Sequence, residues 1–200
     1  MRLLEIGAKV TREGWDNIGL EAGIIHDCTF PMPFEPDTYD GIFSEHFIEH
    51  LHKHEGIRHL KDCKRILKPE GTIRIAWPAY EHIEWLTCEE NEGKLNRHPY
   101  VRTYKDIWDQ ERERGVNPSW AVEPDPNKSV QENVTLNLLE QNGEHKYLWP
   151  VKEMIDTLAK IGYTNVLKIK TQKSRIEQFK NIEETAPCKM FETTIVEATA

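Results

Sequence analysis

Three histidines at four-residue spacing are the first residues that could do chemistry in this chain. His46, His50 and His54 would share one face of a helix, with Glu45 and Glu49 beside them. Two histidines one helical turn apart can bind zinc. The sequence shows no third ligand for such an ion, so we expect no metal at this site. We interpret His50 as a residue that makes structural hydrogen bonds near the start of a helix.

His46 and His145 are the candidate catalytic residues. His46 closely follows a predicted strand, where a neutral imidazole could remove a proton from an oxygen or nitrogen acceptor. A histidine tied into the start of the next helix is the structural alternative. His145 ends a long charged segment, and we expect that segment to return to the same pocket.

Glycine and carboxylate residues stand where predicted strands end. Gly7 ends the first strand, where a glycine lets the backbone turn sharply and approach a ligand, and the carboxylate of Glu5 could hold an ammonium group. Asp27 follows the third strand signal. Its carboxylate could accept a hydrogen bond from an exocyclic amine such as that of adenine, or it could cap its own loop.

Alternating strand and helix signals in the first 80 residues predict a parallel sheet with crossover helices, whose ligands bind beyond the carboxyl ends of the strands. Residues 81–147 are rich in charge, and their apolar content is too small for a core of their own. We therefore expect one domain over residues 1–200, with 81–147 as a helical and loop insertion on the acceptor side. A polar, lysine-rich connection joins the last two strands. Strands are predicted at 3–8, 16–20, 23–26, 39–44, 72–77, 165–170 and 193–198, and helices at 46–67, 81–90, 103–113, 129–141 and 151–161.

In this order, the segments resemble the class I S-adenosylmethionine-dependent methyltransferases, in particular the short methyltransferase type 11-like members. The resemblance implies a doubly wound, Rossmann-like α/β fold with a mostly parallel seven-stranded sheet. It further implies that the last strand is antiparallel, that the helical insertion follows the fifth strand and that S-adenosylmethionine is the cofactor. The matching stretches are 3–8, 14–18, 26–34, 39–46, 49–51, 65–75, 145–149, 162–163 and 195–198.

The same resemblance implies a set of cofactor contacts at the ends of the first four strands. Glu5, Gly7 and Ala8 would contact the methionine part, Asp27 and Cys28 the adenine, and Ser44 with Glu45 the sulfonium side.

Two residues depart from the family pattern. Lys9 replaces the second glycine of the first loop, and it brings positive charge towards a site for a cationic sulfonium. Gly19 stands where an acidic residue would grip the ribose hydroxyls, and Glu21 is the carboxylate that would substitute. The first hypothesis is an active methyltransferase, and the alternative is a methyltransferase-like binding or scaffold module without turnover.

The composition and one short motif indicate which kind of acceptor and which cellular compartment to expect. A net charge of -8 argues against a broad electrostatic grip on nucleic acid. The tetrapeptide after the fourth strand, residues 44–47, lacks the Asn/Asp-Pro-Pro signature of amino-methylating nucleic-acid enzymes, which favours a small-molecule or saccharide-type acceptor. No apolar run reaches the roughly 20 residues that cross a bilayer. The four cysteines are scattered, as in a cytoplasmic protein with reduced thiols.

Overall fold

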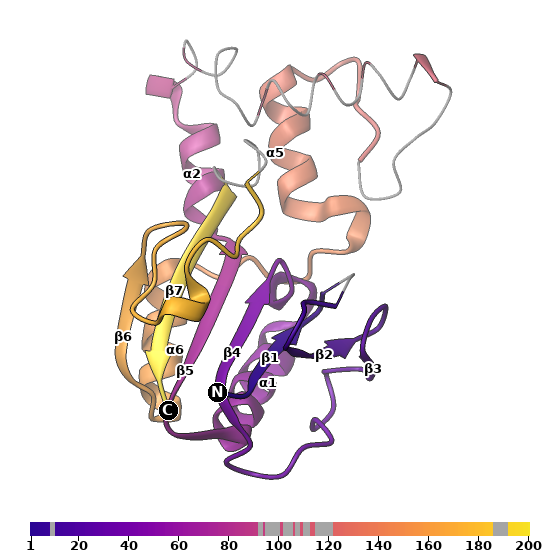
Figure 1. Cartoon of the computed structure of the whole chain (residues 1–200). Helices are drawn as coiled ribbons and strands as arrows, with labels where there is room; N and C mark the ends of the chain where they lie inside the picture. The colour runs from indigo at the N-terminus through magenta and orange to yellow at the C-terminus, as the bar shows by residue number, and fades with distance from the viewer. Residues whose placement is uncertain are drawn as a thin grey trace.

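Seven strands form one sheet within the part of the chain that the structure describes, in the order β3-β2-β1-β4-β5-β7-β6 (Figure 1). The structure is a computed structural model, and it describes residues 1–8, 11–91, 94, 101, 106, 109, 113–114, 122–185 and 192–200. Neighbouring strands run parallel from β3 to β5, and β7 runs antiparallel to both β5 and β6, which confirms the predicted topology. The strands are β1 (Leu3–Ile6), β2 (Asp16–Gly19), β3 (Ile24–Ile25), β4 (Tyr39–Glu45), β5 (Leu67–Pro78), β6 (Thr164–Ile169) and β7 (Thr193–Thr199).

The direction of the strand order reverses between β1 and β4. From β1 the chain moves outward to β2 and β3, then returns to pair β4 with the other side of β1, where Ile6 lies opposite Ser44. The connections that leave the carboxyl ends of β1 and β4 therefore diverge. Such a divergence is where an open α/β sheet holds its ligand.

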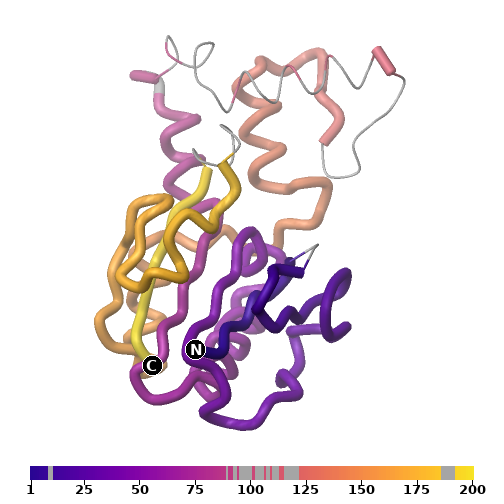
Figure 2. The backbone as a smooth tube through the Cα atoms, in the orientation of Figure 1, coloured from indigo at the N-terminus to yellow at the C-terminus, as the bar shows by residue number. Residues whose placement is uncertain are grey.

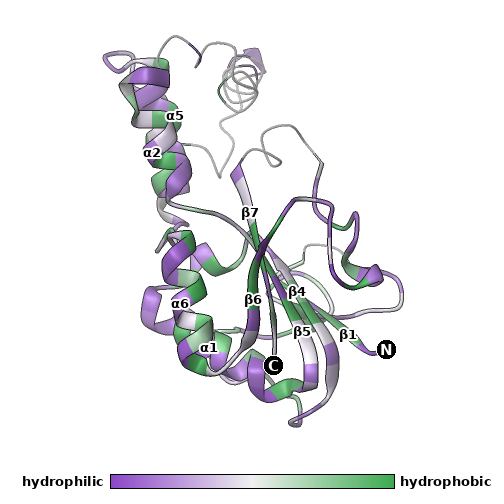
Figure 3. Ribbon diagram, turned by 90° about the vertical axis from the view of Figure 1, so that its left-hand side faces the viewer, coloured by the Kyte–Doolittle hydropathy of each residue, from purple (hydrophilic) through white to green (hydrophobic). Residues whose placement is uncertain are grey.

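One face of the sheet is covered by two helices, α1 (Lys53–Ile66) and α6 (Val151–Ile161), which lie on the same side in Figure 3. Apolar residues of both helices pack on the buried aliphatic side chains of the strands, because each helix carries its apolar residues on one face. Trp149 is fully buried in this core, and its carbonyl accepts a hydrogen bond from Trp77 Nε1 at 2.8 Å. Gly162 ends α6 in the left-handed region at φ 99°, as predicted for a C-terminal cap.

The opposite face is covered by the 170–184 segment, which belongs to the connection between β6 and β7. Phe179 is fully buried there and packs over Gly41, where a Cβ atom would lie 2.8 Å from the Phe179 ring. Leu3 and Phe43 complete the same apolar cluster. The described residues between β1 and β2 (7–8 and 11–15) contain no helix. The 170–184 segment therefore covers a face of the sheet that a crossover helix between β1 and β2 would otherwise cover.

A fully buried ion cluster ties the 170–184 segment to the sheet. The Arg74 guanidinium on β5 donates to the carboxylates of Glu183 and Glu197, and none of the three side chains is exposed. Glu197 also accepts hydrogen bonds from Ser174 and from Arg175 of the segment.

The predicted helix over 46–67 is wrong in its first part. Residues 48–50 form the short 3-10 helix η1 (Ile48–His50), and α1 begins only at Lys53. His52 adopts an extended conformation before it, and its backbone N–H donates to Glu55 Oε2 at 3.0 Å, which fixes the start of the helix. His46, His50 and His54 therefore do not share a helix face.

Helices from the 81–147 region stand beyond the carboxyl ends of β4 and β5, at the opposite end of the sheet from both termini (Figure 2). They are α2 (Glu81–Thr87), the 3-10 helix η2 (Glu89–Asn91), α5 (Val130–Glu140) and the 3-10 helix η3 (Gln141–Gly143). The predicted helix at 103–113 and Lys9 lie outside the described residues. None of the described helices is both long and apolar enough to span a bilayer.

Candidate functional site

The end of β1 has no room for a side chain. Gly7 has φ +79°, and a Cβ atom there would lie 2.7 Å from Phe47. The end of β2 approaches it closely, since a Cβ atom on Gly19 would lie 3.3 Å from the Cα atom of Gly7. Ala8 is half-buried beside this turn. Only glycine fits at the carboxyl end of β1, because the Phe47 side chain and the positive φ exclude a Cβ atom at residue 7.

Glu5 is paired with a cation of the same chain. It is 8% exposed, and its two carboxylate oxygens accept hydrogen bonds from Nε and a terminal nitrogen of Arg12, each at 3.1 Å. The Arg12 guanidinium also lies 5.4 Å from the centre of the Trp15 ring and donates to the Ile182 carbonyl. A ligand ammonium would compete with Arg12 for Glu5.

The residues after β3 divide between solvent and core. Asp27 is exposed, and its Oδ1 accepts hydrogen bonds from the backbone N–H of Thr29 at 2.9 Å and the Thr29 hydroxyl at 2.8 Å, which lower the pKa of Asp27. Cys28 is buried, and burial raises the pKa of its thiol to about 12. Glu21 is exposed in the bend after β2.

Ser44 and Glu45 end β4 at the same edge. Ser44 is buried between β1 and β5. The Glu45 carboxylate accepts two hydrogen bonds from the backbone N–H of Glu184, at 3.0 and 3.2 Å, while burial raises the pKa of Glu45. Glu45 thus holds the end of the 170–184 segment beside the strand ends.

His46 has both ring nitrogens engaged. It takes a left-handed conformation, with φ 49°, directly after β4. Its Nδ1 donates to Glu49 Oε1 at 3.2 Å, and its Nε2 lies 3.1 Å from the hydroxyl of Thr193. This hydrogen bonding agrees with the structural alternative for His46.

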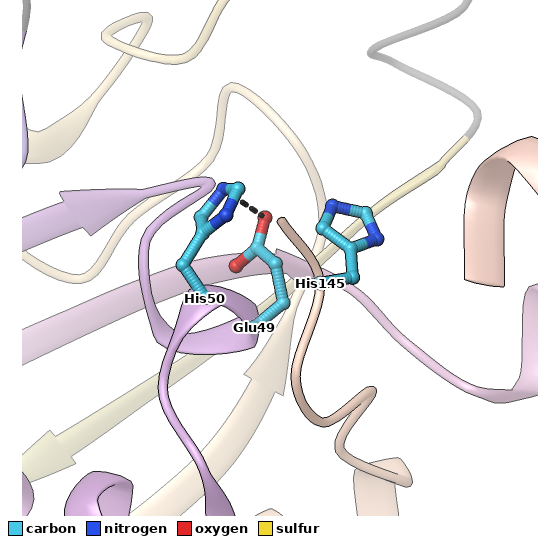
Figure 4. A group of neighbouring side chains, drawn as sticks. All are labelled: Glu49, His50 and His145. Atoms are coloured by element: carbon cyan, nitrogen blue, oxygen red, sulfur yellow. Dashed lines mark ion pairs between the residues drawn. The ribbon is translucent and has the colours of Figure 1, made fainter. Parts of the chain in front are cut away.

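Glu49, His50 and His145 form a compact cluster in which the carboxylate lies between the two imidazole rings (Figure 4). The Glu49 carbonyl accepts hydrogen bonds from the backbone N–H groups of Lys146 and Tyr147, at 2.8 and 3.1 Å, which brings His145 beside η1. One ligand atom from each of the three residues lies within 4.8 Å of the others.

The electrostatics of the cluster depend on the fully buried Glu49. Burial alone would raise its pKa, but the hydrogen bond from His46 and the charges of His46, His50 and His145 lower it. Burial lowers the pKa of His145 and so favours its neutral form. The sequence did not reveal this grouping, because Glu49 and His145 lie far apart in the chain and are brought together by tertiary contacts.

Comparison with known proteins identifies the fold. Residues 8–75 match the family model described as "Methyltransferase domain". A S-adenosylmethionine-dependent methyltransferase from Archaeoglobus fulgidus is 13% identical, with a TM-score of 0.53 over 100% of this chain and 86% of that one. The chain has the fold of the class I S-adenosylmethionine-dependent methyltransferases. This fold confirms the predicted resemblance. A separate search of curated proteins found no match.

Two further methyltransferases of known structure share the fold over about half of their own length. The CurJ carbon methyltransferase is 13% identical, with a TM-score of 0.50 over 100% of this chain and 48% of that one. Phosphoethanolamine N-methyltransferase 2 of Haemonchus contortus, solved with S-adenosylmethionine, is 13% identical, with a TM-score of 0.50 over 99% of this chain and 48% of that one.

On this class I methyltransferase fold, the residues predicted to contact the cofactor lie at or near the carboxyl ends of β1 to β4. His46 and His145 both lie near the carboxylate of Glu49. The cofactor contacts and the catalytic roles remain predictions. Sequence reasoning missed Arg12 as the partner of Glu5, because a salt bridge between a strand residue and a loop residue seven positions later has no sequence pattern.

Proposed function

We propose that this protein binds S-adenosylmethionine at the carboxyl ends of β1 to β4 and transfers its methyl group to a small-molecule or saccharide-type acceptor. The observation that supports this most is the end of β1, where Gly7 has a left-handed conformation and no space for a side chain, at the point where the strand order reverses. In the reaction the bond between carbon and the sulfonium sulfur breaks as the methyl group bonds to the acceptor. S-adenosylhomocysteine and one proton leave.

The cofactor contacts in this proposal follow the strand ends. Glu5, Gly7 and Ala8 bind the methionine part, Asp27 and Cys28 the adenine, Glu21 the ribose, and Ser44 with Glu45 the sulfonium side. The sulfonium is already activated, so holding the two reactants in line accounts for most of the rate.

His145 is the better candidate for the general base. Its Nδ1 donates to the Leu138 carbonyl at 2.6 Å, so the neutral ring has its lone pair on Nε2. Burial lowers its pKa, which favours that neutral form at pH 7. His46, with both nitrogens engaged by Glu49 and Thr193, is a positioning residue in this scheme.

A non-catalytic binding or scaffold module is the second candidate function. The Arg12 guanidinium occupies the carboxylate that would hold the cofactor's ammonium group, and Gly19 replaces the acidic residue at the end of β2. Both features weaken a cofactor site without altering the fold.

Calorimetric titration with S-adenosylmethionine and S-adenosylhomocysteine separates the two candidates. We expect micromolar binding of the native chain, about -8 kcal/mol. Arg12→Gln should bind S-adenosylmethionine roughly 3 to 10 times more tightly, because Glu5 becomes free to accept a charge-assisted hydrogen bond.

Arg2→Gln is the matched control, since Arg2 pairs with Asp16 at the other end of the strands and should leave binding unchanged. If neither the native chain nor Arg12→Gln binds either compound while both remain folded, the proposed methyl transfer is wrong and the non-catalytic module is the remaining candidate.

A further inference from the structure

The carboxylate of Glu49 has one oxygen without a hydrogen-bond donor among the described residues. It is fully buried, yet its Oε2 atom has no hydrogen-bond partner among them. Only Oε1 is engaged, by Nδ1 of His46 at 3.2 Å. An ionised carboxylate without full compensation costs several kcal/mol when it is buried. The unpaired Oε2 atom can therefore accept a further donor or a cation.

Two histidines beside this carboxylate have their Nδ1 atoms bonded to backbone carbonyls. Nδ1 of His50 donates to the Glu144 carbonyl at 3.2 Å, and Nδ1 of His145 donates to the Leu138 carbonyl at 2.6 Å. A carbonyl oxygen can only accept, so each neutral ring must have its unprotonated nitrogen at Nε2. A backbone carbonyl on the other nitrogen is how metal-binding histidines are commonly oriented.

The spacing of the three residues is close to that of a metal site. His50 Nε2 lies 4.0 Å from Glu49 Oε1, and one ligand atom from each residue lies within 4.8 Å of the others. Zinc bonds of about 2.0–2.1 Å in a tetrahedral arrangement separate ligand atoms by roughly 3.3 Å. Side-chain movements of about 1 Å would therefore close the three ligands around an ion.

We propose that Glu49, His50 and His145 bind a divalent transition-metal ion of the zinc class. Two imidazoles and a carboxylate suit such ions better than magnesium or calcium, which prefer oxygen ligands. His46 would orient the Glu49 carboxylate through its hydrogen bond to Oε1, the same oxygen that lies 4.0 Å from His50 Nε2. Three protein ligands leave a coordination position open to water or to an oxygen of a second molecule.

The place of the site suggests what fills that open position. His50 lies in η1 just after β4, and its side chain is 32% exposed, so the ion can be reached from solvent. With Nε2 of His145 bound to the ion, His145 would no longer act as the general base, and the ion itself would make a bound hydroxyl group lose its proton more readily. The class of acceptor this favours is one that carries a hydroxyl group. This last step rests on the proposed methyl transfer, whereas metal binding does not.

Metal binding can be measured directly on the whole chain without a methyl donor. Protein treated with a chelator is titrated with Zn²⁺ by calorimetry and with Co²⁺ by visible absorption. We expect one equivalent to bind with micromolar or tighter affinity, and the absorption of Co²⁺ to be that of a low-coordinate nitrogen and oxygen site. His145→Gln and His50→Gln should each weaken binding at least 100-fold.

Two further variants keep the result interpretable. His54→Gln is the matched control, because His54 is exposed on α1 and should leave the affinity unchanged. Glu49→Gln should bind no metal, yet it should melt at or above the temperature of the metal-free native chain because it removes a buried charge. Sub-stoichiometric binding, or equal binding by the His145→Gln, His50→Gln and His54→Gln variants, would overturn the site. Failure here leaves cofactor binding untouched, so the two proposals fail separately.

Discussion

At the scale of single residues, a second buried histidine shows how this core depends on pH. His59 is fully enclosed, and its Nδ1 donates to the Cys28 carbonyl at 3.2 Å while Nε2 faces the Cys63 thiol at 3.3 Å. Burial lowers the pKa of His59 to about 4. The imidazole is therefore neutral in the folded protein at pH 7 and remains so well into the acidic range.

His59 should make the folded state less stable in mild acid. In the unfolded chain the pKa of His59 is about 6.5. Below that pH the unfolded state binds a proton at His59, whereas the folded state does not. Its contribution is present in full above pH 6.5 and is lost as the pH falls towards 4, by about 3 kcal/mol. Chemical unfolding at pH 7.5 and pH 5 should detect about 2 kcal/mol of this loss.

His59→Gln should flatten that pH dependence, whereas the exposed His54→Gln should retain it. An equally steep dependence in all three proteins would mean that other groups control the acid response.

At the scale of elements, the irregular 170–184 segment covers one face of the sheet, as a helix would. The 170–184 segment contributes Phe179, Ile176 and Ile182 to the apolar cluster on the face of the sheet opposite α1 and α6. The Phe179 ring lies 6.4 Å from that of Phe43 and 5.7 Å from that of Trp15. Its packing should therefore matter as much as that of a core helix.

Phe179→Ala should lower the free energy of unfolding by about 3–5 kcal/mol, the cost of a large cavity in a packed core. Denaturant unfolding gives the value. Phe30→Ala is the matched control, because Phe30 is 64% exposed and should change stability by at most about 0.5 kcal/mol. Equal losses in both variants would show that the segment is only loosely attached.

The strands could be predicted from the sequence, whereas the packing of the 170–184 segment could not. Short apolar runs such as Leu3–Ile6 and Thr193–Thr199 have few alternatives to a buried strand. The start of α1 was missed because a histidine occupies the position before it, where serine or aspartate is the usual signal. The 170–184 segment is polar and rich in lysine, and only tertiary packing shows that its three apolar residues share one face.

One part of the candidate site could also be predicted from the sequence, and another part could not. Gly7 and the residues that end β1 to β4 follow from the order of the strands. The cluster around Glu49 does not, because it depends on the N–H groups of Lys146 and Tyr147 bonding to the Glu49 carbonyl. Contacts between residues so far apart in the chain leave no local pattern.

At the scale of the whole molecule, the Arg74 ion cluster joins β5, β7 and the 170–184 segment. Arg74→Met should destabilise the fold by about 3–5 kcal/mol, because it leaves the buried carboxylates of Glu183 and Glu197 without their guanidinium partner. Thermal and denaturant unfolding measure the loss. Adding Glu197→Gln to this variant should recover part of it, since one of the two buried charges is removed.

The exposed ion pair between Lys152 and Asp156 provides the comparison. Lys152→Met should cost at most about 0.5–1 kcal/mol, as is usual for surface pairs. If Arg74→Met were as mild, water or another cation would have to reach the carboxylates.

The place of β7 between β5 and β6 has a consequence for how the chain is made. Within the described sheet β6 pairs only with β7, which is synthesised after it. At about 5–20 residues per second, β6 waits a few seconds on the ribosome for its partner. The open edge of β5 waits longer for β7, because β5 precedes β6 in the chain. Exposed strand edges promote aggregation, and lysines on such an edge oppose it. Lys168, Lys170 and Lys173, in and just after β6, would keep the nascent chain soluble during that interval.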